Sequence, residues 1–551
     1  MKITFKRIFA LLLAVMTLFL FSACNQRSEK PSDSGMIDVV PENTPFDDSD
    51  LSLNTASTHT YAVSTSNRLA TQVGMTVLER GGNAVDAAVA VAYTLSVVQP
   101  YASGLGGGGC LLLYEPEKGE YAFYDYFAKM PDSKGSSKNA IGIPGFVRGL
   151  DTVHKDYGTQ SRKELLAYAI DYAENGCPVT SDIETRINVA YADLKYYRMF
   201  YDENGELLKK GSTLYMKDLA STLKRIANNG ADDFYTGKIA EDLVNSGGTS
   251  FTLDDLAAYS VEKTNPVVSS FCGYEVAAAP APFSGTTVIQ MLRMAEAIDI
   301  KNPDADTIGY LDDLYTITSK AYSNRYSKIA DPEFTKVDEQ KLVSAEYISK
   351  LLDEDVTGIL DDEEHFSTTH FSIIDENGMV VSATNTLSSF WGSRVCVDGI
   401  FLNDTMKHFS SSGINAAEPG KTPRSYSCPM ILRGDGGYIL AIGTPGGNNI
   451  PKILAPVLID YIKFGTDLQN AIFKARIYSK SQDTLIVEKR EFFPLIADVS
   501  NITNNEYFLV WRDDAAYFGN IAAVGYSPEK QRVFSVYDDR RGGASVSTNE
   551  N

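Results

Sequence analysis

The stretch at 368–387, TTHFSIIDENGMVVSATNTL, has the pattern of two β-strands joined by a tight turn. Apolar residues alternate with small polar residues on both sides of the turn ENG at 376–378, and Asn-Gly is a pair that short hairpin loops prefer. We therefore predict a β-hairpin with strands at 368–375 and 379–386. The first residue of this hairpin is Thr368.

The N-terminal half contains a helix pair followed by a second pair of strands. LATQVGMTVLERGG at 69–82 predicts a helix that ends at its two glycines, and Asn83 is placed to cap a helix at 84–98. Apolar residues surround nearly the whole of that second helix, so we expect it to be buried. Strands are predicted at 110–116 and 120–127, and residues 160–350 are expected to be mostly helical.

The glycine-rich run SGLGGGGC at 103–110 formally matches GxGxxG through Gly104, Gly106 and Gly109. A dinucleotide site requires that loop to follow a strand and to open a helix, and here the order is reversed. We therefore favour close backbone packing between a central helix and a strand, where side chains would not fit.

Composition places the chain among globular proteins and disfavours nucleic acid as a partner. The 551 residues are 44% hydrophobic and 22% charged, and 71 acidic residues outnumber 50 basic ones to give a net charge of −21. A nucleic-acid-binding surface needs clustered positive charge, which this balance does not favour.

The first residues have the pattern of an export signal. Lys2, Lys6 and Arg7 precede an apolar run at 8–21, which is shorter than the roughly 20 residues that span a membrane. FSAC at 21–24 resembles a bacterial lipobox, so residues 1–23 are predicted to be a lipoprotein signal peptide and Cys24 the lipidated residue. The alternative is an ordinary signal peptide. Residues 24–58 are predicted to be a disordered tether that holds the protein at the outer face of the cytoplasmic membrane or in the periplasm.

Metal and disulfide chemistry receive little support. Five cysteines are scattered along the chain after Cys24: Cys110, Cys177, Cys272, Cys396 and Cys428. We expect most of them to be buried free thiols, and a single disulfide bond between two of them is the alternative. The chain has five histidines and no HExxH, so we expect no metal centre.

A loop that could bind an anion lies in GGYILAIGTPGGNNIPKILAPVLIDYI at 436–462, which predicts a strand, a glycine turn and a helix. Asn448 or Asn449 lies near the helix cap and Pro451 in the first turn. The amides of Gly446 and Gly447 would face outward, ready for an anion or a developing oxyanion. A phosphate-binding P-loop would need a GK[ST] sequence, which is absent. A purely structural turn is the remaining alternative.

From about 60 to 545 the sequence resembles the γ-glutamyltransferase family, also known as the glutathione hydrolase family. The shared landmarks occur in order along the chain: LATQVGMTVLERGGNAVDAAVA at 69–90, SGLGGGGC at 103–110, IPGFVRGL at 143–150, NRYSKIADPEF at 324–334, TTHFSIIDENGMVVSATNTL at 368–387, GTPGG at 443–447 and YDDR at 537–540.

This resemblance implies an α+β fold, the four-layer αββα sandwich of N-terminal-nucleophile hydrolases. It also implies a precursor that cuts itself between Ser367 and Thr368, giving a heterodimer of a large chain at 59–367 and a small chain at 368–551. Thr368 would be nucleophile and base, because a freed α-amine can accept the proton of its own hydroxyl. Thr386 would orient Thr368, and Gly446 and Gly447 would hold the oxyanion. No metal or cofactor is implied.

The sequence departs from the family where the glutamyl group is normally bound. Phe127 stands where an arginine is usual. Ser425 and Tyr426 replace a serine pair, and the ligands of the α-amino group become Ser388, Thr405 and His408. Arg424 and Lys129 lie within two positions of the lost carboxylate ligands, so we predict that one of them binds the carboxylate instead.

Three functions follow as hypotheses. The first is a self-processing γ-glutamyltransferase or glutathione hydrolase that passes an acyl group from Thr368 to water or to an amine. The second is a depolymerase or transpeptidase acting on poly-γ-glutamate or on a cell-wall γ-peptide. The segment at 410–423 is short, which would leave the cleft open to such polymers. The third is a degenerate lipoprotein that only binds.

Overall fold

The predicted hairpin is present as strands β9 (Ser367–Ile374) and β10 (Val380–Ser388), paired antiparallel from Val380↔Ile374 onward. The computed structural model describes residues 60–132, 138–355, 367–490 and 507–548. The predicted signal peptide, Cys24 and the tether lie outside these residues. The described residues all belong to one unit, Thr55–Asn551.

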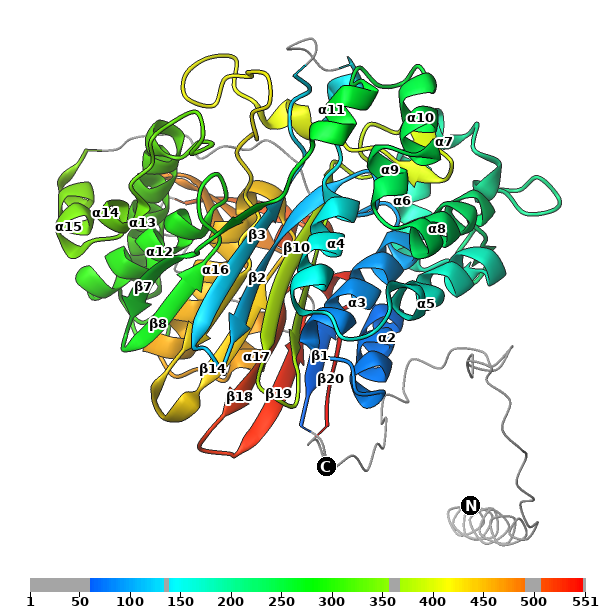
Figure 1. Ribbon diagram of the computed structural model, residues 1–551. Coiled ribbons are helices and arrows are strands. Elements are labelled where there is room, and N and C mark those ends of the chain that lie inside the picture. The colour runs from blue at the N-terminus through cyan, green and yellow to red at the C-terminus, as the bar shows by residue number, and fades with distance from the viewer. Residues whose placement is uncertain (1–59, 133–137, 356–366, 491–506, 549–551) are drawn as a thin grey trace, which may run out of the picture. The chain divides into compact units, whose positions relative to one another are not determined.

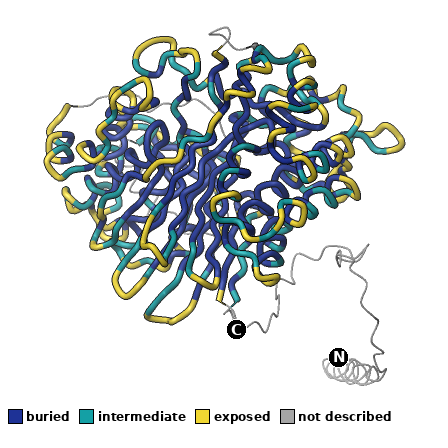
Figure 2. The backbone as a smooth tube through the Cα atoms, in the orientation of Figure 1, coloured by how far each residue is buried: buried dark blue, intermediate teal, exposed yellow. Residues whose placement is uncertain are grey.

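The hairpin lies in the middle of a seven-stranded sheet. Its order is β20-β1-β9-β10-β2-β3-β6. The outer members are β1 (Ala62–Thr65), β2 (Gly108–Glu115), β3 (Glu120–Tyr126), β6 (Glu262–Thr264) and β20 (Ala544–Ser547). Both faces of this sheet are buried (Figure 2). The alternation in the hairpin therefore sorts side chains between two cores rather than between core and solvent.

A six-stranded sheet packs against one face of the first sheet. It consists of β19 (Arg532–Tyr537), β18 (Ala522–Ser527), β14 (Ile439–Gly443), β13 (Met430–Arg433), β8 (Tyr274–Ala278) and β7 (Val267–Phe271). Small and apolar side chains from both sheets form a shared core that includes Cys110, Leu112, Ile374, Ala441 and Val524.

Helices cover the outer faces of the two sheets (Figure 1). Against the first sheet lie α2 (Arg68–Glu79) and α3 (Ala84–Val98), with α4 (Phe146–Tyr157) and α5 (Arg162–Asn175) around them. Asn83 caps α3 in a capping box with Asp86, as predicted, and α3 is buried over its whole length. Against the second sheet lie α12 (Gly285–Ala297), α13 (Thr307–Lys328) and α16 (Ile450–Leu458).

Shorter elements complete the described chain. The helices are α6 (Ser181–Val189), α7 (Tyr191–Leu194), α8 (Lys217–Asn229), α9 (Asp232–Tyr235), α10 (Lys238–Asn245), α11 (Leu253–Ala258), α14 (Glu339–Leu342), α15 (Ala345–Asp353) and α17 (Leu468–Phe473). The strands are β4 (Cys177–Pro178), β5 (Thr213–Leu214), β11 (Cys396–Val397), β12 (Ile400–Phe401), β15 (Ile477–Ser481), β16 (Thr484–Glu488) and β17 (Phe508–Arg512).

The α+β class is confirmed, and residues 160–350 are mostly helical as predicted, with short strands between the helices that the sequence pattern did not indicate. Within the region expected to be mostly helical, β7 and β8 form a hairpin around Cys272 and Gly273, which both adopt positive φ. The five cysteines at 110–428 are free thiols. Cys110, Cys177 and Cys428 are buried. In the described part of the chain, no helix is long and apolar enough to cross a membrane, and no group of three potential metal ligands occurs.

Candidate active site

Thr368 is the second residue of β9 and is almost completely buried. Its hydroxyl donates to the carbonyl oxygen of Ser367 at 2.7 Å and lies 3.2 Å from the hydroxyl of Thr386 on β10. The Thr386 hydroxyl also donates to the Ser367 carbonyl and accepts from the Ser388 amide at 2.8 Å. Two hydroxyl groups therefore converge on the peptide bond between Ser367 and Thr368.

An irregular pairing brings these groups together. The register of β9 with β10 shifts between Asn385 and Ser388, so Thr386 and Leu387 lie outside the regular ladder opposite Thr368, and pairing resumes at Ser388↔Ser367. On the other side of β10, a Cβ atom on Gly107 would lie 2.2 Å from the carbonyl oxygen of Thr386. The glycine run thus permits close backbone packing, as predicted, but its closest partners are β10 and the backbone of Phe401 rather than a central helix.

The second glycine loop follows β14 and precedes α16. Gly446 and Gly447 both adopt positive φ, at 147° and 56°, which L-residues with side chains disfavour. A short 3₁₀ turn, η5 (Gly447–Asn449), opens into α16 with Pro451 in its first turn. The first amides of such a helix lack intrahelical acceptors and are available to an anion. Asn449 is the cap residue, but no hydrogen bond from its side chain caps the helix.

Thr368 opens onto a cavity of about 450 Å³. Its lining unites the predicted nucleophile with most of the predicted substrate ligands, and it comprises Arg325, Tyr326, Thr368, Thr386, Ser388, His408, Phe409, Ser410, Ser411, Arg424, Ser425, Tyr426, Ser427, Gly447, Asn448 and Ile450. Two arginines and a histidine are in this set. None of these described lining residues is an aspartate or a glutamate.

Ser388 and His408 form one polar pair in the cavity wall. Ser388 has a positive φ of 82°, and its hydroxyl lies 2.7 Å from His408 Nε2. The imidazole ring is tilted against the ring of Phe127, with 6.1 Å between centroids. Phe127 itself is buried, so it supports His408 from behind.

Arg424, Ser425 and Tyr426 line the same cavity and lie in the segment before β13. The Arg424 guanidinium stacks on Tyr326 at 4.9 Å and donates to Ser410 Oγ at 3.0 Å. Buried Arg325 donates to the carbonyl of Phe283 at 2.7 Å and to that of Ser425. Sequence reasoning missed Arg325, although it lies within the NRYSKIADPEF landmark.

Two predicted ligands lie elsewhere. Lys129 forms an ion pair with Glu262 at 3.0 Å and is not among the residues that line the cavity. Thr405, in the 3₁₀ turn η3 (Thr405–His408), is buried, and its amide donates to Asn403 Oδ1 at 3.1 Å. Neither Lys129 nor Thr405 lines the cavity at Thr368, so this geometry does not support their predicted roles in binding substrate.

Burial shifts the pKa values of two side chains near Thr368, those of His370 and Arg541. Desolvation lowers the pKa of His370 to about 3, so its imidazole is neutral between Thr384 Oγ1 at 2.8 Å and Ser372 Oγ at 3.1 Å. Desolvation also lowers the pKa of the Arg541 guanidinium to about 10, with Arg186 adding to the effect. Arg541 Nη1 lies 3.5 Å from the carbonyl oxygen of Thr368. The charge near the backbone of Thr368 is therefore positive.

Comparison with known proteins agrees with this geometry. The family model described as gamma-glutamyltranspeptidase matches residues 70–548. The chain is 40% identical over 489 residues to the capsule biosynthesis protein CapD proenzyme of Bacillus anthracis, covering 88% of this chain and 90% of that protein. It is 29% identical over 540 residues to the glutathione hydrolase proenzyme of Bacillus subtilis (strain 168), covering 88% and 91%.

Among solved structures, the cephalosporin acylase from Bacillus halodurans superimposes with a TM-score of 0.79 at 25% identity, covering 93% of this chain and 99% of that one. The chain therefore belongs to the gamma-glutamyltranspeptidase family and is an acyltransferase or hydrolase with an N-terminal threonine nucleophile.

Proposed function

We propose that the chain is a precursor that cuts itself between Ser367 and Thr368 and then transfers γ-glutamyl groups through an acyl-enzyme on Thr368. The observation that carries this proposal is the pair of hydroxyl contacts at the Ser367 carbonyl, made by Thr368 and Thr386. The first group is placed to attack and the second to stabilise the oxygen.

In the proposed processing step, an N-to-O acyl shift is followed by hydrolysis of the resulting ester. Thr368 Oγ1 attacks the carbonyl carbon of Ser367, the peptide C–N bond breaks, and the amide nitrogen takes up a proton to become the α-amine. The resulting ester between Ser367 and the Thr368 hydroxyl is then cleaved by water. The products are a new carboxylate on Ser367 and a free amine and hydroxyl on Thr368.

The same hydroxyl then serves in turnover. The freed α-amine, whose ordinary pKa is about 8, accepts the hydroxyl proton as Thr368 attacks a γ-glutamyl amide. Thr386 orients the nucleophile, and the amides of Gly446 and Gly447 bind the oxyanion. The leaving amine takes the proton, and water or another amine later resolves the acyl-enzyme.

We also infer a four-layer architecture, two chains after cleavage and a lipid anchor outside the cytoplasmic membrane. The two packed sheets and their outer helices support a four-layer αββα sandwich, divided by cleavage into chains at 59–367 and 368–551. The lipobox-like FSAC supports a lipid anchor on Cys24 outside the cytoplasmic membrane. A Cys24→Ser variant that still partitioned with membranes would contradict the anchor.

A pair of isosteric variants tests the central proposal. Thr368→Val removes the nucleophile, and we expect an uncut, inactive chain on a denaturing gel. Thr369→Val is the matched control, because Thr369 is the next residue of β9 and its hydroxyl instead contacts Ser66 and Gln99. We expect this control to be cut into two chains. Efficient cleavage of the Thr368 variant would refute the proposal.

The lining of the cavity favours the polymer hypothesis over small donors such as glutathione. Arg325 and Arg424 can attract carboxylates, whereas no carboxylate among the described lining residues is available to a free α-ammonium group. A γ-glutamyl unit inside a chain, with its α-amine acylated, matches this charge pattern. The similarity to a protein named for capsule biosynthesis points in the same direction.

Matched donors separate these two readings. We expect a γ-glutamyl anilide with an acetylated α-amine to give a higher kcat/KM than the same anilide with a free amine, and poly-γ-glutamate to be shortened faster than glutathione is hydrolysed. The reverse order for both pairs would favour a glutathione hydrolase. Membership of a family of enzymes argues against the binding-only alternative.

A further inference from the structure

The two glycines of the proposed oxyanion loop have no side chains that could fix their conformation. Gly446 and Gly447 both adopt positive φ, and glycine moves between such conformations more freely than other residues. A backbone donor contributes to catalysis only when it is held in place before the reaction, since a displacement of about 1 Å can cost about 100-fold in rate. The residues around the glycines must therefore set the direction of their amides.

Contacts before the glycines hold the N-terminal side of the loop. The hydroxyl of Thr444 accepts from the amide of Asn520 at 3.0 Å and donates to the carbonyl oxygen of Pro445 at 2.7 Å. A Cβ atom on Gly519 would lie 2.6 Å from that carbonyl oxygen, so the loop lies directly against Gly519. All of these residues belong to the proposed small chain, 368–551.

A tyrosine of the proposed large chain holds the other side of the loop. Tyr322 on α13 is buried, and its hydroxyl donates to the carbonyl oxygen of Asn448, the residue that follows the two glycines. Next to it, the side-chain amide of Asn449 donates to the carbonyl oxygen of Tyr517 at 3.2 Å. The glycines therefore lie between fixed points that precede and follow them, and Tyr322 supplies one of these points from the chain that does not carry the loop.

Neighbours on two sides fix the ring of Tyr322. It stacks on Tyr426, with 5.9 Å between centroids and 28° between planes, and Lys452 Nζ on α16 lies 5.3 Å from its centroid. The guanidinium of Arg325 lies 4.6 Å from the ring of Tyr426. Tyr426 and Arg325 line the cavity at Thr368, whereas Tyr322 is not among the described lining residues. Tyr322 therefore contacts the loop from behind the cavity wall.

We propose that Tyr322 is a positioning residue for the oxyanion loop. Its hydroxyl holds the Asn448 carbonyl so that the amides of Gly446 and Gly447 point at the carbonyl oxygen of the acyl group on Thr368. The large chain thereby shapes a site whose reacting groups come from the small chain. This inference rests on the proposed function, because it assumes that the two glycine amides bind the oxyanion.

Cleavage and turnover should respond differently when the Tyr322 hydroxyl is lost. In the proposed cleavage, the hydroxyls of Thr368 and Thr386 contact the Ser367 carbonyl. In the proposed turnover, the loop amides bind the oxyanion instead. Removal of the Tyr322 hydroxyl should therefore impair turnover and spare cleavage, whereas a general loss of folding would impair both.

Tyr322→Phe tests the positioning role, because the ring and its stacking partners stay and only the hydroxyl is removed. With a γ-glutamyl anilide as donor, we expect kcat to fall at least tenfold and KM to stay within about twofold, since complete loss of an oxyanion donor costs on the order of 100- to 1,000-fold in kcat. The pH dependence of kcat/KM should not change, because no charge is removed. Cleavage, followed over time on a denaturing gel, should keep its normal rate.

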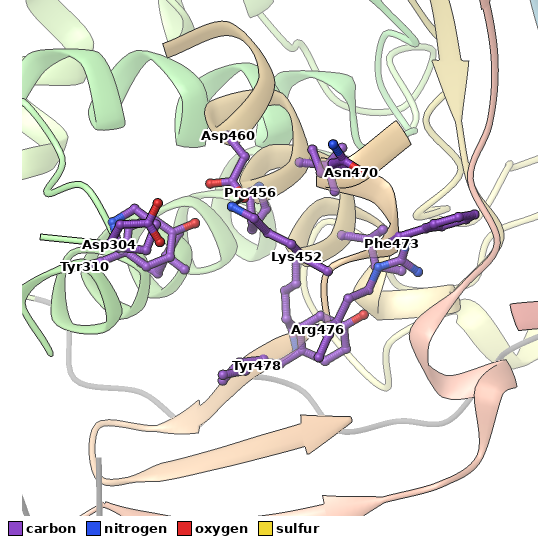
Figure 3. Close-up of a pocket in the computed structure, with 17 residues that line it drawn as sticks. Asp304, Tyr310, Lys452, Pro456, Asp460, Asn470, Phe473, Arg476 and Tyr478 are labelled. Atoms are coloured by element: carbon purple, nitrogen blue, oxygen red, sulfur yellow. Dashed lines mark hydrogen bonds and ion pairs between the residues drawn. The ribbon is translucent and has the colours of Figure 1, made fainter. Parts of the chain in front are cut away.

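Tyr310→Phe is the matched control. Tyr310 is a buried tyrosine of the same helix, and its ring lies edge-on to Phe464. It lines a second cavity, of about 360 Å³, across from Phe473 (Figure 3), and this cavity shares no described lining residue with the one at Thr368. We expect the kcat, the KM and the cleavage rate of this control to match those of the unmodified protein.

The outcomes separate failure of the positioning role from failure of the proposed function. An unchanged kcat in Tyr322→Phe, an equal loss of kcat and cleavage rate, or the same fall of kcat in Tyr310→Phe would overturn the positioning role alone. An unmodified chain that stays whole on the gel would refute the proposed function, and the positioning role with it.

Discussion

A threonine hydroxyl is a weak nucleophile at neutral pH, so the reactivity of Thr368 must come from its surroundings. In the uncut chain its hydroxyl and that of Thr386 both reach the Ser367 carbonyl, while Arg541 lies near the Thr368 carbonyl. Positive charge near a freed amine lowers its pKa and keeps more of it in the basic form. The arrangement therefore suits both cleavage and later proton transfer.

Arg424 is expected to bind the carboxylate of the donor. Truncating it in Arg424→Ala should raise the donor KM by about 10- to 150-fold, since a charge-assisted hydrogen bond contributes about 1.5–3 kcal/mol, and should change kcat little. Steady-state kinetics with a γ-glutamyl anilide measure this. Arg433→Ala, on β13 outside the cavity lining, is the control. An unaltered KM for every donor would exclude the role.

His370 should make stability depend on pH. Its pKa is about 3 in the folded protein and about 6.5 when exposed, so the unfolded chain binds the extra proton between these values. Stability is therefore complete above pH 6.5 and falls as the pH drops towards 3. The loss at pH 5 is about 2 kcal/mol.

Unfolding by urea at pH 7 and pH 5 tests this for the unmodified protein and for His370→Gln. Burial raises the pKa of Asp125 to about 7, which acts in the opposite direction over the same range. The difference between the two proteins isolates His370. Equal pH dependence in both would show that His370 does not titrate in this way.

At the scale of elements, the sequence predicted those features that depend on neighbouring residues. The Asn-Gly turn and the alternation of apolar and polar residues predicted β9 and β10, and the Asn83 cap predicted the start of α3. The hairpin of β7 and β8 was missed because Cys272, the first residue of its two-residue turn with Gly273, is not a residue type that usually adopts positive φ. The pairing of His408 with Ser388 was also invisible, because contacts across the chain leave no local pattern.

The close packing of Gly107, which immediately precedes β2, on β10 gives a prediction at the scale of elements. In Gly107→Ala the new methyl group meets the carbonyl oxygen of Thr386, so we expect a loss of about 1–3 kcal/mol in unfolding free energy and slower processing. In Gly104→Ala the nearest atom, Ser96 Cβ, lies 3.5 Å away, so this control should unfold almost normally. Thermal denaturation compares the two. Equal melting temperatures would contradict the close approach.

At the scale of the whole molecule, cleavage would not separate the two proposed chains. Strand β1 of the larger chain pairs with both β9 and β20 of the smaller chain, and β13 of the smaller chain pairs with β8 of the larger. The two parts share both sheets and the core between them. Family resemblance predicted the two chains, but this interleaving is visible only in the three-dimensional structure.

The interleaved sheets predict that both chains elute together from a sizing column after processing and separate only in denaturant. Breaking the contact would require unfolding both sheets at once. Native and denaturing chromatography of the same sample measure this. A small chain that elutes alone under native conditions would show that the shared sheets do not hold the parts together.

The most direct test of the account is the N-terminal sequence of the smaller chain from the purified, active enzyme. If cleavage frees the amine of the nucleophile, that chain begins Thr-Thr-His-Phe, starting at Thr368. A chain that begins at any other residue, or a preparation that is fully active while uncut, would contradict the central claim.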